Sequence, residues 1–276
     1  MFELPEFINL ARQMNETLRG KKIQAGQLGN TPHKFVWYNC SHEEFARLTK
    51  GRTVGRASAR GKWLFIPLEP DYLLLLGECG GKVLYHARGV SLPKKYHLYL
   101  TFEDGSFLTA TTVMWGAMEL YEQGYEQNRQ YIKDMRTTPV EPGFTYEYFQ
   151  SLLHAHEEGA KWSLKALLTQ DQMIPGLGNA IAQDILFRAR LDPRHAVQEL
   201  TPTQSRLLYA AIMDTVKEVI ACGGRYDEFD LFNRRGKYAR LMDRHALERP
   251  CPACGGVIKK IQYLGGACYI CSKCQQ

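Results

Sequence analysis

The stretch CPACGGVIKKIQYLGGACYICSKC, residues 251–274, decides how the C-terminal part of the chain folds. It holds two Cys-x-x-Cys pairs, Cys251 with Cys254 and Cys271 with Cys274, separated by 16 residues. Thiolates at this spacing can converge on one tetrahedral ion, and the bound ion supplies folding energy that so short a segment lacks. We therefore predict a zinc ribbon with one structural Zn²⁺. A pair of disulfides or a redox dithiol is the alternative reading, and the nearby Cys268 could compete as a ligand although it breaks the paired spacing.

The charge of the chain is concentrated around this ribbon. From Asn233 to the C-terminus there are nine basic and two acidic side chains, a formal charge of +7, which leaves −1 on all the preceding residues. A cationic end on a near-neutral body indicates an anionic partner at that end. Ribbons of this kind bind DNA, RNA or protein, so the zinc site alone does not choose among these partners.

The composition is that of a globular protein and excludes several classes. Apolar residues make up 45% and charged residues 23% of the 276, which is typical of a packed core and not of a disordered chain. The longest aliphatic run, residues 73–76, is far too short to cross a bilayer. No signal peptide pattern opens the chain, so we expect a cytoplasmic protein with no membrane partner.

Three regimes along the chain predict an α+β fold. Residues 1–135 carry one early helical pattern followed by alternating, β-rich runs, which predicts an antiparallel β-sandwich or flattened barrel. Residues 136–143 contain two prolines and no periodicity and are the predicted linker. Helical patterns then dominate residues 144–232, and residues 233–276 form the basic segment and zinc ribbon. The predicted helices cover residues 146–156, 163–169, 180–189 and 203–220.

A glycine-rich turn separates two of these helices. In Pro175-Gly176-Leu177-Gly178-Asn179, two glycines spaced one residue apart allow a tight turn and a close approach of a ligand to the backbone. A helix N-terminus placed after such a turn can bind an anion, most often phosphate. Asn179 adds a side-chain donor, and Lys165 on the preceding helix adds a positive charge. An ordinary turn between helices is the alternative, but beside a zinc ribbon and a cationic tail the motif favours a clamp on a nucleic-acid backbone.

The N-terminus holds the candidate catalytic groups. Glu3 and Glu6 lie in the first turn of the first helix, where acids also favour the helix dipole without any catalytic role. The sharper interpretation is a terminal amine on Met1 beside a general acid. An α-amine has a pKa of about 7.7–8.0, so part of it is neutral at pH 7 and can attack a carbon centre. Lys62, in the loop Arg60-Gly61-Lys62-Trp63, can supply a further charge.

Taken together, these motifs resemble the formamidopyrimidine-DNA glycosylase / endonuclease VIII family. The start Glu3-Leu4-Pro5-Glu6, the hairpin Arg60-Gly61-Lys62, the Gly-x-Gly-Asn turn and the four-cysteine finger occur in that family in the same order and cover essentially the whole chain. The resemblance implies an N-terminal β-sandwich, a helix–two-turns–helix domain, a zinc finger, and double-stranded DNA with a damaged or abasic nucleotide as the partner of a monomer.

The resemblance also implies roles for individual residues. The residue after the initiator methionine forms a Schiff base with the deoxyribose in that family, the matching Glu3 assists as an acid, and the matching Lys62 assists catalysis and contacts phosphate. The positions of Lys165 and Asn179 hold backbone phosphates around the extruded nucleotide. The remaining residues that we predict to bind DNA are Gly176, Gly178, Lys95 and Trp115.

Several family positions are changed in this chain. Phe2 replaces the terminal proline, and a bulky second residue blocks removal of Met1, so the amine lies one residue earlier. Gly266 stands at the position of the finger arginine that grips a phosphate and promotes the second elimination. Glu78 replaces a methionine, and Val113-Met114-Trp115-Gly116 replaces Arg-Arg-Phe-Gly, with Trp115 keeping an aromatic wedge. These changes predict that DNA binding is better preserved than lyase chemistry.

Three hypotheses follow. The first is a DNA glycosylase of base excision repair that extrudes a damaged base and cleaves its N-glycosidic bond, with altered lyase activity. The second is a non-catalytic module that recognises abasic or distorted DNA. The third, binding of RNA or protein through the ribbon, predicts a binding constant with little salt dependence if the partner is a protein, whereas phosphate contacts predict a steep one.

Overall fold

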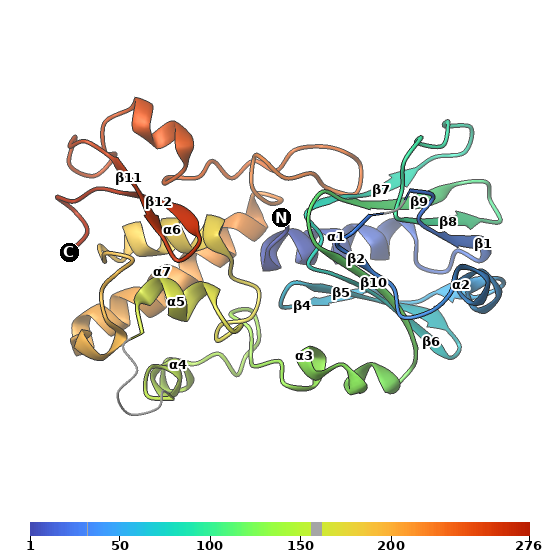
Figure 1. Cartoon of the computed structure of the whole chain (residues 1–276), viewed down its shortest axis with the longest axis horizontal. Helices are drawn as coiled ribbons and strands as arrows, with labels where there is room; N and C mark the ends of the chain where they lie inside the picture. The colour runs from blue at the N-terminus through green and yellow to red at the C-terminus, as the bar shows by residue number, and fades with distance from the viewer. Residues whose placement is uncertain (32, 156–161) are drawn as a thin grey trace. The chain divides into compact units, whose positions relative to one another are not determined.

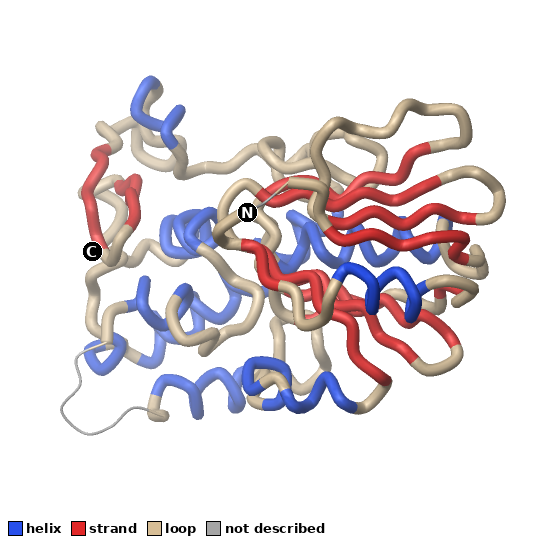
Figure 2. Tube along the Cα trace, turned by 45° about the vertical axis from the view of Figure 1, so that its right-hand side comes forward, coloured by secondary structure: helices blue, strands red, loops and turns tan. Residues whose placement is uncertain are grey.

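The computed structural model describes residues 1–31, 33–155 and 162–276. It divides into two compact units. The first comprises Met1–Met135 and Cys222–Lys237, and the second comprises the rest, Arg136–Ala221 and Tyr238–Gln276. Figure 1 follows the chain through both, and Figure 2 shows that strands dominate the first unit and helices the second. Residues 222–237, which the sequence analysis divides between the helical domain and the basic segment, thus belong to the first unit.

The first unit is a β-sandwich. Its four-stranded sheet has the order β1-β8-β9-β7, all pairs antiparallel, with bounds Ile23–Leu28, Leu98–Phe102, Phe107–Thr112 and Gly81–His86. Its second sheet has the order β2-β10-β6-β5-β3, with β4 paired to β5, and bounds Val36–Trp37, Gly116–Glu122, Tyr72–Gly77, Trp63–Glu69, Thr53–Val54 and Ser58–Arg60. Strands β8 and β9 form a hairpin whose turn contains Gly105 at φ +81°.

The burial of the strands explains their sequence patterns. In β8 the side chains of Leu98, Leu100 and Phe102 are buried while the two between them are only half-buried, as expected for a strand with one face on the core. In β6 all four residues from 73 to 76 are buried, because this central strand is covered on both faces. Two of them pack in the main core between the sheets, and two pack with Trp63 in a smaller cluster.

Helix α1, Leu4–Thr17, confirms the predicted early helix, and its apolar stripe of Phe7, Leu10 and Met14 lies in the main core. The sequence analysis did not find α2, His42–Thr49, which begins at the N-cap Ser41. Only two of its eight residues are buried, so its sequence carries little helical periodicity. The short helices η1 and α3 cover Tyr125–Asn128 and Gln130–Lys133.

The second unit contains the predicted helices and the hairpin of the ribbon. The helices are α4 Tyr146–Leu153, α5 Leu164–Thr169, α6 Asn179–Arg188 and α7 Pro202–Ala221, with short helices η2 Val197–Glu199 and η3 Arg244–Glu248. The predicted helix over 146–156 thus ends at Leu153, and part of that prediction, residue 156, lies outside the described residues. Thr145 and Ser163 cap α4 and α5 through their side-chain oxygens.

The C-terminal hairpin consists of β11, Lys259–Tyr263, and β12, Gly266–Ile270, in antiparallel register. A buried carboxylate ties the preceding segment to helix α6, because Asp184 accepts the hydroxyl of Tyr238 at 2.8 Å and the amides of Leu241 and Met242. Across residues 1–31, 33–155 and 162–276, the structure has no helix that is both long and apolar enough to span a bilayer.

Candidate functional site

The predicted acids Glu3 and Glu6 lie at the start of α1 and are both only 4% exposed. Glu3 is the N-cap residue, in extended conformation, and its amide donates to Oε2 of Glu6 at 2.9 Å. Pro5 fits the first turn of the helix, where no amide donor is needed. The local sequence thus fixes the two carboxylates side by side inside the protein, where an unpaired charge would be costly.

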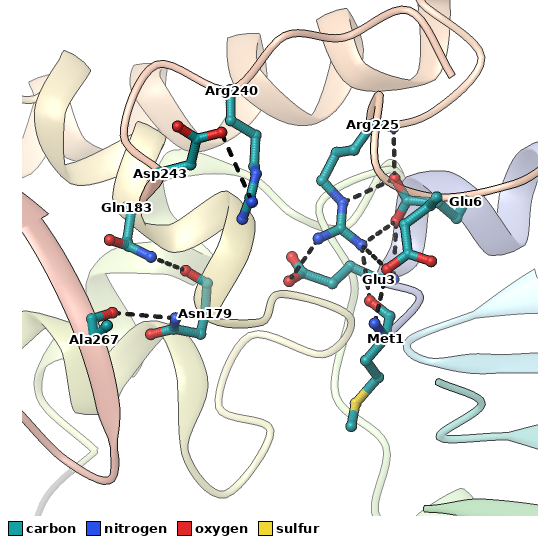
Figure 3. Close-up of polar contacts among 10 residues, drawn as sticks. Met1, Glu3, Glu6, Asn179, Gln183, Arg225, Arg240, Asp243 and Ala267 are labelled. Carbon is teal, nitrogen blue, oxygen red and sulfur yellow. Dashed lines mark hydrogen bonds and ion pairs between the residues drawn. The ribbon is translucent and has the colours of Figure 1, made fainter. Parts of the chain in front are cut away.

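The cation that balances them is Arg225, from the second segment of the first unit. Its Nε and Nη2 donate to the two oxygens of Glu6 at 3.0 Å each, and its backbone amide donates to the same carboxylate at 3.0 Å. Nη1 lies 3.6 Å from Oε1 of Glu3. Figure 3 shows the guanidinium among these carboxylates. Arg225 is fully buried; burial lowers its pKa, but Glu6, Glu3 and Glu228 more than offset that effect and raise the pKa above its usual range.

Two glycines allow Arg225 to reach this position. Helix α7 ends at Ala221, and Gly223 and Gly224 follow with φ of +71° and +100°, the left-handed region that favours glycine. A Cβ on Gly224 would lie 3.3 Å from the side chain of Glu6, so the backbone approaches the carboxylate closely. The same two glycines follow the end of α7, which matches the predicted helix over residues 203–220 to within one residue at each end.

The amine of Met1 joins the same cluster. It donates to Oε1 of Glu228 at 2.7 Å, and the carbonyl of Met1 accepts from Nη2 of Arg225 at 2.8 Å. Together Met1, Arg225 and the three carboxylates of Glu3, Glu6 and Glu228 carry a formal charge of −1. A cluster with this balance can stabilise positive charge that develops on a bound group.

Phe2 has a structural place in this unit. Its amide donates to the carbonyl of Cys79 at 3.0 Å, and its ring is fully buried, packed edge-on against Phe7 with centroids 5.6 Å apart. The amide nitrogen at this position is therefore held inside the fold, while the nitrogen of Met1 lies at the end of the chain, beside Glu228.

Lys62 and Glu78 lie at neighbouring turns of the same unit. Lys62 is buried in the β4–β5 turn, where Gly61 has φ +58°, and its carbonyl accepts the amide of Glu78 at 3.2 Å. Glu78 itself has φ +52°. Burial, and secondarily the charge of Glu78, raise the pKa of Tyr131 well above its usual range.

The two other predicted DNA-binding residues of the first unit are exposed. Trp115 is 42% exposed and stacks on Trp37, with ring centroids 5.2 Å apart and planes 5° from parallel. Lys95 lies in the loop before β8, next to Tyr96. Neither residue belongs to the carboxylate cluster.

In the second unit, the structure brings Lys165 and Asn179 to the turn of the C-terminal hairpin. Nζ of Lys165, which is only 3% exposed, donates to the carbonyl of Tyr263 at 2.5 Å, and the amide of Asn179 donates to the carbonyl of Ala267 at 3.3 Å (Figure 3 draws the second contact). A Cβ on Gly266 would lie 3.3 Å from Nζ of Lys165. The position of the missing finger arginine is therefore beside these two side chains.

The glycine turn before α6 has the expected geometry. Gly176 has φ +95°, which favours glycine, and its amide donates to the side chain of Gln172 at 3.2 Å. Gly178 is the extended N-cap of α6, and Asn179 is the first helical residue. Both glycines are buried and Asn179 is exposed, so its side chain is the part of the motif open to a partner.

The four predicted cysteines converge. Their sulfur atoms all lie within 4.8 Å of one another, with Sγ–Sγ distances of 3.8 Å for Cys251 to Cys274 and 3.6 Å for Cys254 to Cys271. A tetrahedral zinc with Zn–S bonds of about 2.3 Å has edges of about 3.8 Å, so the donor set fits this ion. Cys268 lies on β12, opposite Ile261 and outside this set.

The match to known proteins covers the chain from end to end. Models of the formamidopyrimidine-DNA glycosylase N-terminal domain and of its H2TH domain match residues 1–113 and 136–229. The formamidopyrimidine-DNA glycosylase of Bacillus licheniformis is 30% identical over 281 residues and is covered in full, as is this chain. This chain belongs to the formamidopyrimidine-DNA glycosylase family. The Bacillus subtilis glycosylase of that name is 29% identical, with 99% of its length covered.

Solved structures of the family share the fold. The Lactococcus lactis Fpg in complex with DNA that contains an abasic site has a TM-score of 0.87 and 23% identity, with 99% of both chains covered. The same protein with DNA that contains an N7-benzyl-Fapy-dG has a TM-score of 0.87 and 24% identity, again with 99% coverage. The β-sandwich, the H2TH helices and the four-cysteine ribbon of this chain are thus those of the glycosylase family.

Two residues of this glycosylase-family site were missed by the sequence analysis, Arg225 and Glu228. Both lie more than 200 residues from the N-terminus, and neither stands in a motif that the resemblance quotes. The predicted residues themselves are divided by unit. Met1, Glu3, Glu6, Lys62, Lys95 and Trp115 belong to the first, and Lys165, Gly176, Gly178, Asn179 and the four cysteines belong to the second.

Proposed function

We propose that this chain is a DNA glycosylase of base excision repair, which binds double-stranded DNA with a damaged nucleotide, extrudes that nucleotide and cleaves its N-glycosidic bond. The observation that carries the proposal is the end-to-end family match combined with a retained Glu3, buried beside the terminal amine. Extrusion is required because the reacting atoms of a base are shielded inside the stack. The relatives carry the glycosylase name, and structures of the Lactococcus lactis protein contain abasic or damaged DNA.

Glu3 is the proposed general acid, and Glu6 holds it in place through the hydrogen bond from the amide of Glu3. Arg225 pairs with both buried side chains, and the excess of carboxylates in the cluster favours the positive charge that develops on the sugar as the base leaves. Lys62 is proposed to contact phosphate and to assist proton transfer.

The amine of Met1 is the proposed nucleophile for a lyase step. It attacks C1′ of the sugar, and loss of water gives a protonated imine that β-elimination can resolve. Because Phe2 occupies the family's proline position and is held in the core, we expect this step to be slower than glycosidic cleavage. A water molecule activated by a carboxylate is the competing route to base release.

Lys165, Asn179 and the backbone around Gly176 and Gly178 are proposed to hold the phosphates of the damaged strand. Lys165 and Asn179 already meet at the hairpin turn, where one cation and one amide can bridge an anion. The remaining proposed DNA contacts are Lys95 and Trp115.

Zn²⁺ is proposed to bind Cys251, Cys254, Cys271 and Cys274, where it stabilises the ribbon and takes no part in the reaction. We expect a monomer in the bacterial cytoplasm, associated with the nucleoid through its DNA binding.

A panel of oligonucleotides tests the proposal, each carrying one oxidised, ring-opened or abasic nucleotide in paired DNA. We expect base release from at least one damaged duplex, and Glu3→Gln to lower the single-turnover rate by about 100- to 10,000-fold, the range of one general acid. Glu16→Gln, on the exposed face of the same helix, is the matched control and should leave the rate unchanged.

Borohydride trapping on the abasic oligonucleotide then separates the two routes. An adduct whose peptide mass includes Met1 supports the imine, whereas base release without an adduct supports water as the nucleophile. Tight binding of the whole panel with no base release, unaltered in Glu3→Gln, would show a recognition module instead of an enzyme.

A further inference from the structure

Three large aromatic side chains are exposed together in the first unit, and we call Phe35, Trp37 and Trp115 the aromatic surface. Their exposed fractions are 38%, 49% and 42%. Trp37 and Trp115 stack in parallel, and Phe35 lies against Trp115 with centroids 4.7 Å apart. Since Trp115 contacts both other rings, Trp37, the most exposed of the three, offers the most open ring.

The backbone beneath the aromatic surface is firmly held. Strand β2, which carries Trp37, pairs in parallel with β10 directly after Trp115 (Figure 1). The amide of Gly116 donates to the carbonyl of Phe35 at 3.0 Å, and Thr112 donates its hydroxyl to the carbonyl of Trp115 at 2.5 Å. A surface that is ordered before its ligand arrives loses little entropy on binding.

The segments around the aromatic surface are basic. Residues 33–39, 94–99 and 112–117 contain three lysines and no acid. Lys34 places Nζ 5.7 Å from the ring centroid of Phe35, and Lys94 and Lys95 are exposed on a loop that the side chain of Asn30 binds through the carbonyl of Lys94 at 3.0 Å. Rings bordered by positive charge complement a base attached to a phosphate backbone.

We propose that the aromatic surface stacks an unpaired nucleobase of the bound DNA, with Trp37 supplying the ring face, so that the protein binds DNA with unpaired bases more tightly than fully paired DNA. Stacking on aromatic side chains tolerates every base, because each has a π-face. The inference rests on the proposed DNA function and deepens it. The resemblance gives only Trp115 a place against DNA, whereas this surface adds Trp37 and Phe35.

The size of the aromatic surface favours a base over a protein partner. A buried aromatic side chain contributes about 150–250 Å², so three rings that are less than half exposed offer roughly 200–300 Å². A stable protein interface needs about 800 Å² from each partner. A nucleobase, in contrast, requires only one ring face of comparable size.

The test uses the full-length protein and DNA without any lesion. The dissociation constants for a short oligothymidylate and for the same strand annealed to its complement are measured by fluorescence anisotropy at one salt concentration. We expect Trp37→Ala to weaken binding to the single strand by about 5- to 150-fold, the effect of losing one base stack, and binding to the duplex by less than about 2-fold. Trp37→Phe should restore most of the affinity.

Tyr125→Ala, which removes a still more exposed aromatic side chain of the same unit, is the matched control and should change neither constant. Thermal unfolding of each variant confirms that the fold is intact. Equal losses on both DNA forms, or no loss on either, overturn the inference. Base release from paired damaged DNA is measured separately. If the protein releases the base but Trp37→Ala binds the single strand normally, this inference fails while the proposed function stands.

Discussion

Arg225 and Glu6 lie 219 positions apart in the sequence, yet three nitrogens of the arginine, two of its side chain and its amide, each lie 3.0 Å from the carboxylate. Both side chains are almost completely buried, so the ion pair lies away from solvent. The guanidinium of Arg225 also contacts Glu3 and the carbonyl of Met1. Arg225 therefore connects the members of the N-terminal cluster to one another.

Removing this cation should destabilise the protein strongly. Arg225→Ala removes the cation that pairs with the buried carboxylates, and breaking a buried ion pair costs about 3–5 kcal/mol. Urea unfolding measures the loss. Arg234→Ala, which breaks an exposed pair with Asp230, should cost less than about 1 kcal/mol. A loss below about 1 kcal/mol for Arg225→Ala would mean that the cluster does not hold α1 to the segment 222–237.

Removing the metal should unfold the ribbon. We expect one zinc per chain by elemental analysis, and loss of near-ultraviolet circular dichroism of the ribbon, with a lower Tm, after strong chelation or in Cys254→Ser. Cys222→Ser, outside the cluster, should keep both zinc and Tm. A metal-free protein with unchanged Tm that becomes sensitive to reducing agent would instead indicate disulfides.

The burial of His97 should make stability depend on pH. Its Nδ1 accepts the amide of Thr112 at 2.9 Å, and burial, together with the nearby His33, lowers its pKa. The unfolded chain, with a histidine pKa of about 6.5, therefore binds the proton more readily, and stability falls as the pH drops below that value until the folded-state pKa is passed.

His97→Asn retains an acceptor for Thr112 but cannot titrate. We expect it to lose less Tm than the natural chain between pH 7.5 and pH 5, and His154→Gln, on an exposed residue, to behave as the natural chain. An identical pH dependence in His97→Asn would assign the loss to other groups.

Restoring the finger arginine should strengthen phosphate contact. In Gly266→Arg the added side chain starts beside Lys165 and Asn179, so we expect the slope of log affinity against log salt to steepen by about one for abasic DNA, with more strand cleavage. Val257→Arg, which adds the same charge at an exposed site before the hairpin, controls for net charge. Equal slopes for the two variants would remove position 266 from the DNA contact.

The elements that short-range patterns encode were predictable from the sequence. Spacing alone identified the four cysteines, and periodicity located α1 and the helices of the second unit, because each signal is contained within a few turns or strands. Strand β2 has only two residues and α2 buries only two, so neither shows a hydrophobic periodicity from which it could be predicted.

Much of the candidate site could not be predicted in this way. Glu3, Glu6 and Lys62 were predicted as site residues from the family resemblance and from their positions near a helix end or in a hairpin. Arg225 and Glu228 reach the same cluster only through the return of residues 222–237 to the first unit, a long-range contact that no local pattern encodes. The exposed stacking of Trp37 on Trp115 likewise depends on the pairing of β2 with β10, which the sequence alone does not predict.

The return of residues 222–237 also sets an order of events on the ribosome. Residues 1–135 emerge first, with the carboxylates of Glu3 and Glu6 in place but without their cation. At about 5–20 residues per second, Arg225 follows roughly 5–20 s later, after nearly all of the second unit's helices have been synthesised. The β-sandwich is therefore expected to wait in an incomplete, acid-rich state, and a gene fragment that stops at residue 135 should yield a protein that stays in it.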